Sequence, residues 1–195
     1  MVIVFKYDIS ENTYLKLLDL NDAEELFALT DRSRDMLREW LLFVDNVKTV
    51  KDTERFILDA MQQYADNNGL QAGIYYEGKL AGVIGYHQIN KEHNWTSIGY
   101  WLGSDFVGKG LVTNSMRAII DYAFDYLKVH RIEVRVAVGN IRSRTIPKVL
   151  GFNEEGRLRE AEWLHDRHVD QVVYGLTAAE WRKIKASSEE KVTIL

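Results

Sequence analysis

Near its middle the chain reads Ile98-Gly-Tyr-Trp-Leu-Gly-Ser-Asp-Phe-Val-Gly-Lys-Gly-Leu-Val-Thr-Asn-Ser-Met-Arg117, and this stretch decides the fold. Residues 98–102 place Ile, Tyr and Leu on one side and Gly and Trp on the other, which predicts a strand. Between residues 112 and 127, apolar side chains recur at helical spacing. The loop 107–110 between them has little side-chain bulk, so it can present backbone N–H groups at a helix N-terminus. Such a loop suits a phosphate or pyrophosphate.

Three families of phosphate-binding loop match this segment in part. Gly103-Ser-Asp-Phe-Val-Gly-Lys fits the start of a Walker A motif, but Gly110 stands where a Ser or Thr must bind Mg²⁺. The dinucleotide-binding fingerprint fails because Thr113 replaces its third glycine. The acetyl-CoA loop of acetyltransferases, commonly Gln/Arg-x-x-Gly-x-Gly/Ala, would read Val107-Gly-Lys-Gly-Leu-Val112, with its first and last positions substituted. A tight turn without a ligand is the alternative.

The composition excludes several classes of protein. A chain of 195 residues and 22.6 kDa is the size of one domain. Its formal net charge of −4 and isoelectric point near 5.8 argue against a broad nucleic-acid-binding surface. The chain has no cysteine, which excludes disulfides, thiolate metal sites and an acyl-cysteine intermediate. We see neither a signal peptide nor an apolar run of membrane-spanning length, so the expected location is the cytoplasm, away from membranes.

The residue patterns along the chain predict a mixed α/β sheet. Strands are expected at 13–18, 70–76, 80–89, 94–102, 131–138, 157–164 and 169–176. Helices are expected at 23–30, 33–43, 53–64, 111–127, 143–150 and 178–185, followed by a short polar tail. Pro147 is expected near the first turn of its helix, and Gly151 after its last turn. Without repeats or linker-like runs, we expect one domain, 1–195, with its core at about 13–181.

A second segment, Asn140-Ile-Arg-Ser-Arg-Thr-Ile-Pro-Lys-Val-Leu-Gly-Phe152, favours the acetyltransferase interpretation. It resembles the Asn-x-x-Ser/Ala…Leu-Gly-Phe segment of the GCN5-related N-acetyltransferases (GNAT), at the expected distance after the glycine loop. Residues 98–102, 170–174 and Leu37-Arg-Glu-Trp-Leu41 resemble the ribosomal-protein N-acetyltransferases of the RimJ/RimL type. The resemblance covers residues 13–181 and depends on the order and spacing of these motifs together. It implies the GNAT fold, a mixed α/β sheet that is splayed at its centre and flanked by helices.

The resemblance implies that acetyl-CoA binds in the notch between the 94–102 and 131–138 strands. Backbone N–H groups of the glycine loop would hold its pyrophosphate, while the strand edge and Asn140 would pair with its pantetheine amides. The implied cofactor-binding residues are Tyr100, Trp101, Leu102, Val107, Gly108, Lys109, Gly110, Leu111, Val112, Thr113, Asn140 and Ser143. The alternatives are a solvated loop lysine for Lys109 and a plain turn residue for Asn140. No metal is implied.

Acetyl transfer requires a neutral amine, a polarised thioester carbonyl and a protonated leaving thiolate. A backbone N–H near Trp101 or Leu102 could polarise the carbonyl. The resemblance implies Glu162 as the general base and as a group that contacts the substrate. A solvent-facing strand carboxylate is the alternative for Glu162, and regular pleating would point Glu160 to the same face.

Ser143 and Trp40 complete the implied site. Ser143 would protonate the thiolate, because Pro147 stands where many members of the superfamily have a Tyr; a helix N-cap is the other explanation for Ser143. Trp40 would line the acceptor pocket, although an aromatic side chain at helical spacing is often part of the core. The scattered histidines, expected on the surface or in the core, are His87, His93, His130, His165 and His168.

The predicted function is therefore an N-acetyltransferase that moves acetyl from acetyl-CoA directly to an amine within a ternary complex. The favoured acceptor is a peptide or protein N-terminus of the ribosomal-protein type. The alternatives are a small amine (a polyamine, amino acid or antibiotic) or a non-catalytic acyl-CoA-binding protein. Gly110 disfavours a phosphate-loop NTPase. A homodimer is expected from the family.

Overall fold

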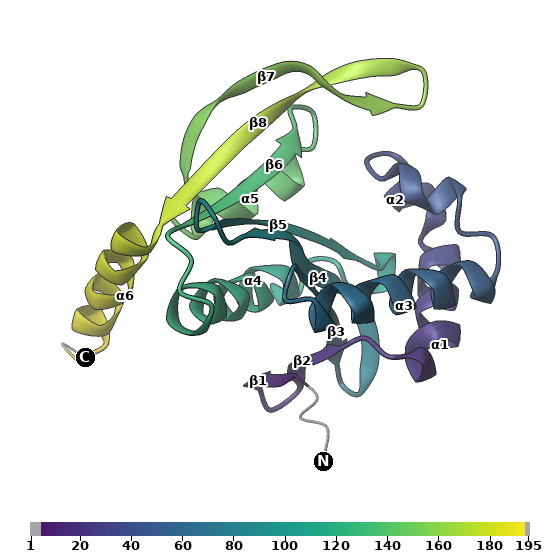
Figure 1. Ribbon diagram of the computed structural model, residues 1–195, viewed down its shortest axis with the longest axis horizontal. Coiled ribbons are helices and arrows are strands. Elements are labelled where there is room, and N and C mark those ends of the chain that lie inside the picture. Colours follow the sequence, from purple (N-terminus) through teal and green to yellow (C-terminus); the bar gives the residue numbers. More distant parts are fainter. Residues whose placement is uncertain (1–4, 194–195) are drawn as a thin grey trace.

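A single sheet of eight strands runs through the part of the molecule that the structure describes (Figure 1). The computed structural model describes residues 5–193, with side chains up to Ser187. The strands are β1 (Lys6–Ser10), β2 (Thr13–Leu17), β3 (Leu70–Tyr76), β4 (Lys79–Asn90), β5 (Trp95–Leu102), β6 (Arg131–Ala137), β7 (Asn153–Leu164) and β8 (Arg167–Thr177). Their order in the sheet is β1-β2-β3-β4-β5-β6-β8-β7.

Helices cover both faces of this sheet. They are α1 (Ala23–Arg32), α2 (Arg34–Arg38), α3 (Val50–Ala65), α4 (Leu111–Asp121), α5 (Ile141–Val149) and α6 (Ala178–Thr193), with the short turns η1 (Leu20–Asp22), η2 (Leu42–Asp45), η3 (Ser104–Phe106) and η4 (Tyr122–Tyr126). On one face, the fully buried Tyr86 donates its hydroxyl hydrogen to the Ile119 carbonyl of α4. On the other face, beside α1 and α3, Tyr75 donates to the buried carboxylate of Asp22 at 2.6 Å. The predicted mixed α/β sheet flanked by helices is confirmed.

The sheet opens between β5 and β6. These two parallel strands pair only where Trp95, Thr96 and Ser97 lie opposite residues 131–133. β5 continues to Leu102 beside β4, and β6 continues to Ala137 beside β8. The two strands therefore diverge after Ser97, and the predicted splay at the centre of the sheet is confirmed.

The N-terminal region differs from the prediction in two places. β1 is an additional strand, paired with β2, ahead of the predicted start of the sheet at residue 13. The predicted helix 33–43 is broken, because α2 ends at Arg38 and the 3-10 turn η2 follows. The guanidinium of Arg34 donates to the carbonyls of Val44 and Val47, the latter at 2.8 Å, and this holds the chain in a turn.

Later elements are present with different ends. The predicted helix 111–127 is α4 followed by η4, a π-helical turn. β7 begins at Asn153, ahead of the predicted residue 157. α6 continues to Thr193, so the predicted end of this helix at residue 185 is wrong. Residues 194–195 of the expected tail, and residues 1–4 of the expected domain, lie outside the described residues.

Candidate active site

The loop between η3 and α4 presents backbone groups rather than side chains. Gly108 and Gly110 have φ angles of +85° and +73°, a left-handed conformation that favours glycine. A Cβ added to Gly108 would meet no atom within 4 Å, so open space lies beside the loop. Gly110 is the N-cap of α4 and supplies no capping side chain, and the first turn of α4 contains no acidic residue. The first amides of α4 are therefore available to an anion.

One edge of β5 faces the gap that opens toward β6. Just beyond the strand, Gly103 donates its N–H to the Ala81 carbonyl on the β4 side at 2.8 Å. The backbone N–H and C=O groups of successive residues point to opposite edges of a strand. Those of Trp101 therefore also point to β4, whereas those of Tyr100 and Leu102 point into the gap. Two backbone N–H groups, those of Trp101 and Leu102, were predicted to polarise the thioester carbonyl. Of these, the N–H of Leu102 lies on the open side.

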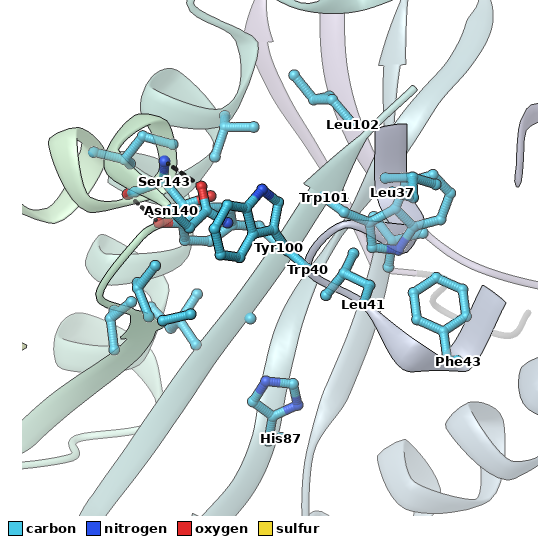
Figure 2. Close-up of a pocket in the computed structure, with 18 of the residues that line it drawn as sticks. Leu37, Trp40, Leu41, Phe43, His87, Tyr100, Trp101, Leu102, Asn140 and Ser143 are labelled. Atoms are coloured by element: carbon cyan, nitrogen blue, oxygen red, sulfur yellow. Dashed lines mark hydrogen bonds between the residues drawn. The ribbon is translucent and has the colours of Figure 1, made fainter. Parts of the chain in front are cut away.

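The opposite wall of the gap begins with α5. The Oδ1 atom of Asn140 accepts the Ser143 N–H at 3.1 Å, so Asn140, and not Ser143, is the N-cap. Pro147 consequently lies in the interior of a helix that begins at Ile141, and its expected place near the first turn is wrong. Proline has no N–H, so the Ser143 carbonyl lacks its helical donor. The Tyr100 hydroxyl donates to this carbonyl instead, at 2.9 Å, and connects β5 to α5 (Figure 2).

Tyr100→Phe is expected to raise the KM for acetyl-CoA several-fold and to lower the unfolding midpoint. The substitution leaves the Ser143 carbonyl without a donor, which costs about 1–3 kcal/mol, and it frees α5 to move relative to β5. Steady-state kinetics and thermal denaturation measure the two effects. Tyr126→Phe, at a residue whose side chain is 70% exposed, is the control. A lowered midpoint with an unchanged KM would restrict Tyr100 to a role in stability.

One cavity of about 1620 Å³ runs from the glycine loop to β7. Of the predicted site residues, those that line it are Trp40, Tyr100, Trp101, Leu102, Val107, Gly108, Gly110, Leu111, Val112, Thr113, Asn140, Ser143 and Glu162. Lys109 does not line it; this exposed side chain places its Nζ atom 5.4 Å from the centre of the Tyr76 ring. The fold thus brings together residues that are far apart in the sequence.

Aromatic side chains surround the part of the cavity beyond the gap. Trp40 is half-buried, and its indole lies against Gly139, where an added Cβ would come within 2.9 Å of Cη2. The ring centres of Phe43 and Trp101 are 5.9 Å apart. Figure 2 shows Trp40 between Tyr100 and Leu41, on the wall of the cavity. Trp40 therefore faces the space in which an acceptor would lie.

An irregularity in β7 points Glu160 and Glu162 in different directions, although regular pleating would place both carboxylates on one face. Its register with β8 shifts between Leu158 and Glu162, and Glu160 within this bulge has a φ angle of +50°. The Glu160 N–H donates to Asp170 at 2.7 Å, and the side chain lies outside the cavity. Glu162 lines the cavity and accepts a hydrogen bond from Gln171 at 3.0 Å. The expectation that both glutamates share a face is wrong because the bulge interrupts the alternation.

The turn between β7 and β8 contacts the segment that carries Trp40. The Nε2 atom of His165 lies 2.6 Å from the Arg38 carbonyl oxygen, and its Nδ1 atom lies 3.9 Å from the Asp45 carboxylate. Figure 1 shows the long β7–β8 hairpin reaching toward α2. This contact joins the strand that carries Glu162 to the segment that carries Trp40.

Two cavity residues have no clear signal in the sequence. Gln171, which holds Glu162, is an ordinary polar residue in an alternating strand. His87 is exposed, as the expectation of a surface or core position allows, and its side chain lines the cavity. It occupies an irregularity of β4 that the periodicity of the sequence does not reveal.

Within residues 5–193, no group of three or more His, Cys, Asp or Glu side chains could hold a metal ion. Over the same part of the chain, no helix is both long enough and apolar enough to cross a membrane.

Comparisons with known proteins agree with this geometry. A family model described as an acetyltransferase (GNAT) domain matches residues 12–153. Over 180 residues the chain is 38% identical to "Putative ribosomal N-acetyltransferase YdaF" of Bacillus subtilis (strain 168), covering 91% of this chain and 98% of that one. It is 25% identical over 166 residues to the ribosomal-protein-serine acetyltransferase of Escherichia coli (strain K12), covering 85% and 93%. The microcin C7 self immunity acetyltransferase MccE, solved in complex with acetyl-CoA and AMP, aligns with a TM-score of 0.84 at 30% identity, covering 87% and 94%.

The chain belongs to the GNAT family of acetyltransferases. It is an acetyl-CoA-dependent N-acetyltransferase, so this prediction is confirmed over the non-catalytic binder and the phosphate-loop NTPase. The described residues fit acetyl-CoA: open space adjoins the left-handed Gly108, where a Cβ would meet no neighbour, and the edge of β5 faces the gap.

Proposed function

We propose that this enzyme acetylates the N-terminal amine of a ribosomal-protein-type acceptor. The observation that carries the proposal is the single cavity that contains the glycine loop at one end and Glu162 with Trp40 at the other. Such a cavity lets a thioester and an amine meet without a covalent enzyme intermediate. The printed names of the relatives from Bacillus subtilis and Escherichia coli support the choice of acceptor.

In this proposal acetyl-CoA supplies the activated acyl group, and the chain binds and orients both partners. The amides at the start of α4 hold the pyrophosphate. The edge of β5 and the side-chain NH₂ of Asn140 pair with the pantetheine amides. The Leu102 N–H polarises the thioester carbonyl. Glu162 attracts the acceptor ammonium and promotes its deprotonation, and Ser143 returns a proton to the thiolate.

A small-molecule amine is the second candidate acceptor. Trp40, Phe43 and Trp101 line the cavity, and such rings suit a flat ligand group. MccE, whose complex contains AMP, supports this alternative.

A panel of amines tests the acceptor. We would measure thiol release from acetyl-CoA with N-terminal peptides of ribosomal proteins, polyamines, aminoglycosides and aminoacyl nucleotide analogues. We expect the highest kcat/KM with an N-terminal peptide, and blocking the N-terminus of that peptide should abolish release. Faster turnover of a small amine would favour the second candidate.

We also propose that residues 1–195 form one domain and that the enzyme acts in the cytoplasm, where ribosomal proteins are made. A homodimer is proposed from the family, and light scattering of the purified protein tests it.

A further inference from the structure

His87 lies at a β-bulge beside the point where the sheet opens. In the ladder between β4 and β5, Tyr86 pairs with Ile98 and Gln88 pairs with Ser97, so His87 is the extra residue. Bulges turn a side chain away from its regular direction and are common next to active sites. Here the bulge adjoins Ser97, the last residue of β5 that pairs with β6.

The His87 ring lies over the floor of the cavity. A Cβ added to Gly99 would come within 2.2 Å of its Nε2 atom, so the imidazole occupies the space that Gly99 leaves open. Figure 2 shows the ring pointing from β4 into the cavity, on the side where Trp40 and Leu41 lie. Among the described residues, no group forms a hydrogen bond with the ring nitrogens. In this part of the chain, no protein hydrogen bond to the ring nitrogens therefore competes with a ligand.

The surroundings of His87 favour the neutral form of its imidazole. Although the ring opens to the cavity, desolvation by the surrounding protein lowers the pKa of His87 below its ordinary value of 6.5. The charged side chains that line the same cavity include Glu39 after α2, Arg55 and Asp59 on α3, Glu133 and Arg135 on β6, and Glu162 on β7. Within the described structure none of them forms an ion pair with His87, and Glu133 is already paired with Arg131 and Arg135. The imidazole therefore carries a free lone pair at neutral pH.

We propose that His87 is a catalytic residue that takes the first proton from the acceptor ammonium. The amine lone pair then attacks the thioester carbon, so that the C–N bond forms and the C–S bond breaks with its electron pair on sulfur. The second proton of the nitrogen passes to that sulfur through the Ser143 hydroxyl, which gives one proton and takes one, and the imidazolium releases the first proton to solvent. One ammonium and one thioester thus give one amide, one thiol and one proton. The inference relies on the proposed function only in that the acceptor arrives as an ammonium ion.

His87 and Glu162 then have different tasks. A proton acceptor works best when its pKa is close to the working pH, which suits an imidazole. A carboxylate is, however, the better partner for a cation in the cavity. Glu162 would hold the ammonium, and His87 would carry the proton away.

The dependence of kcat/KM on pH distinguishes these tasks. In the wild type we expect a plateau between the pKa of His87 and that of the acceptor, which is roughly 8 for an N-terminal amine. His87→Gln should lower kcat/KM at pH 7 about 100-fold and remove the plateau, so that the rate rises tenfold per pH unit up to the pKa of the acceptor. His93→Gln, an exposed residue outside the cavity, should leave the profile unchanged. Glu162→Gln should lower the plateau without removing it.

A plateau that survives in His87→Gln would overturn the proposal, as would its loss in Glu162→Gln. A second measurement requires no turnover. The imidazole proton signal that disappears in His87→Gln should titrate in the wild type with a midpoint below 6.5, and a midpoint at or above 6.5 would also overturn the proposal. If no panel amine is acetylated, the proposed acceptor fails, while the titration still decides the state of His87.

Discussion

Replacing Gly110 with valine is expected to weaken acetyl-CoA binding about 100-fold, which corresponds to about 2.8 kcal/mol. Gly110 has a φ angle of +73° and is the N-cap of α4, so a β-branched side chain is strained there and should displace the amides that we propose to hold the pyrophosphate. The added Cβ would meet only the Asn114 amide, 3.9 Å away, and otherwise enters open space beside the loop. Isothermal titration calorimetry with acetyl-CoA measures the loss.

Gly78→Val is the matched control for this substitution. Gly78 lies in the turn between β3 and β4 with a φ angle of +75°, and a Cβ there would meet no atom within 4 Å. Both variants carry a left-handed residue at a cost of about 1–2 kcal/mol, so their unfolding midpoints should fall by similar amounts. Only Gly110→Val should have a lower affinity for acetyl-CoA. Equal affinities for acetyl-CoA in the two variants would contradict the role of the glycine loop in binding acetyl-CoA.

Glu162→Gln is expected to lower kcat/KM for the acceptor about 100-fold while the affinity for acetyl-CoA persists. The amide has the shape of the carboxylate and can still accept the hydrogen bond from Gln171, so the fold is retained. It lacks the charge that attracts an ammonium ion into the cavity. Steady-state kinetics with the best acceptor, together with calorimetry, separate the two quantities.

Glu160→Gln makes the same chemical change two positions earlier on the strand. The Glu160 side chain lies outside the cavity, so this variant should keep the wild-type kcat/KM. An equal loss in both variants would indicate a general effect of negative charge on the enzyme. A wild-type rate in Glu162→Gln would exclude Glu162 from the reaction.

The elements around the splay follow from local sequence patterns. The alternation in residues 98–102 and the helical spacing that follows are properties of neighbouring residues, and the structure confirms both elements. The glycines of the loop are also local, because their left-handed φ angles depend on the missing side chain. The splay itself was predicted only through the family resemblance, since a strand pattern does not specify where two strands separate.

The errors have causes that lie outside the local pattern. β1 was missed because most of its side chains are exposed and it gives no clean alternation. α2 ends early because Arg34 binds carbonyls 10 and 13 residues further along the chain. The directions of the Glu160 and His87 side chains do not follow from the sequence, for one shared reason. Each lies at a β-bulge, which adds a residue to one strand and is invisible in a period of two.

The contact between His165 and the Arg38 carbonyl also bears on how the enzyme is made. These residues are 127 positions apart, and they join the two segments that carry Glu162 and Trp40. During synthesis from the N-terminus, the glycine loop and α4 leave the ribosome well before the β7–β8 hairpin does. The part of the cavity around Glu162 and Trp40 consequently acquires its last wall only after the β7–β8 hairpin has been synthesised. A chain that terminates before this hairpin would keep the glycine loop but have no enclosed place for an amine.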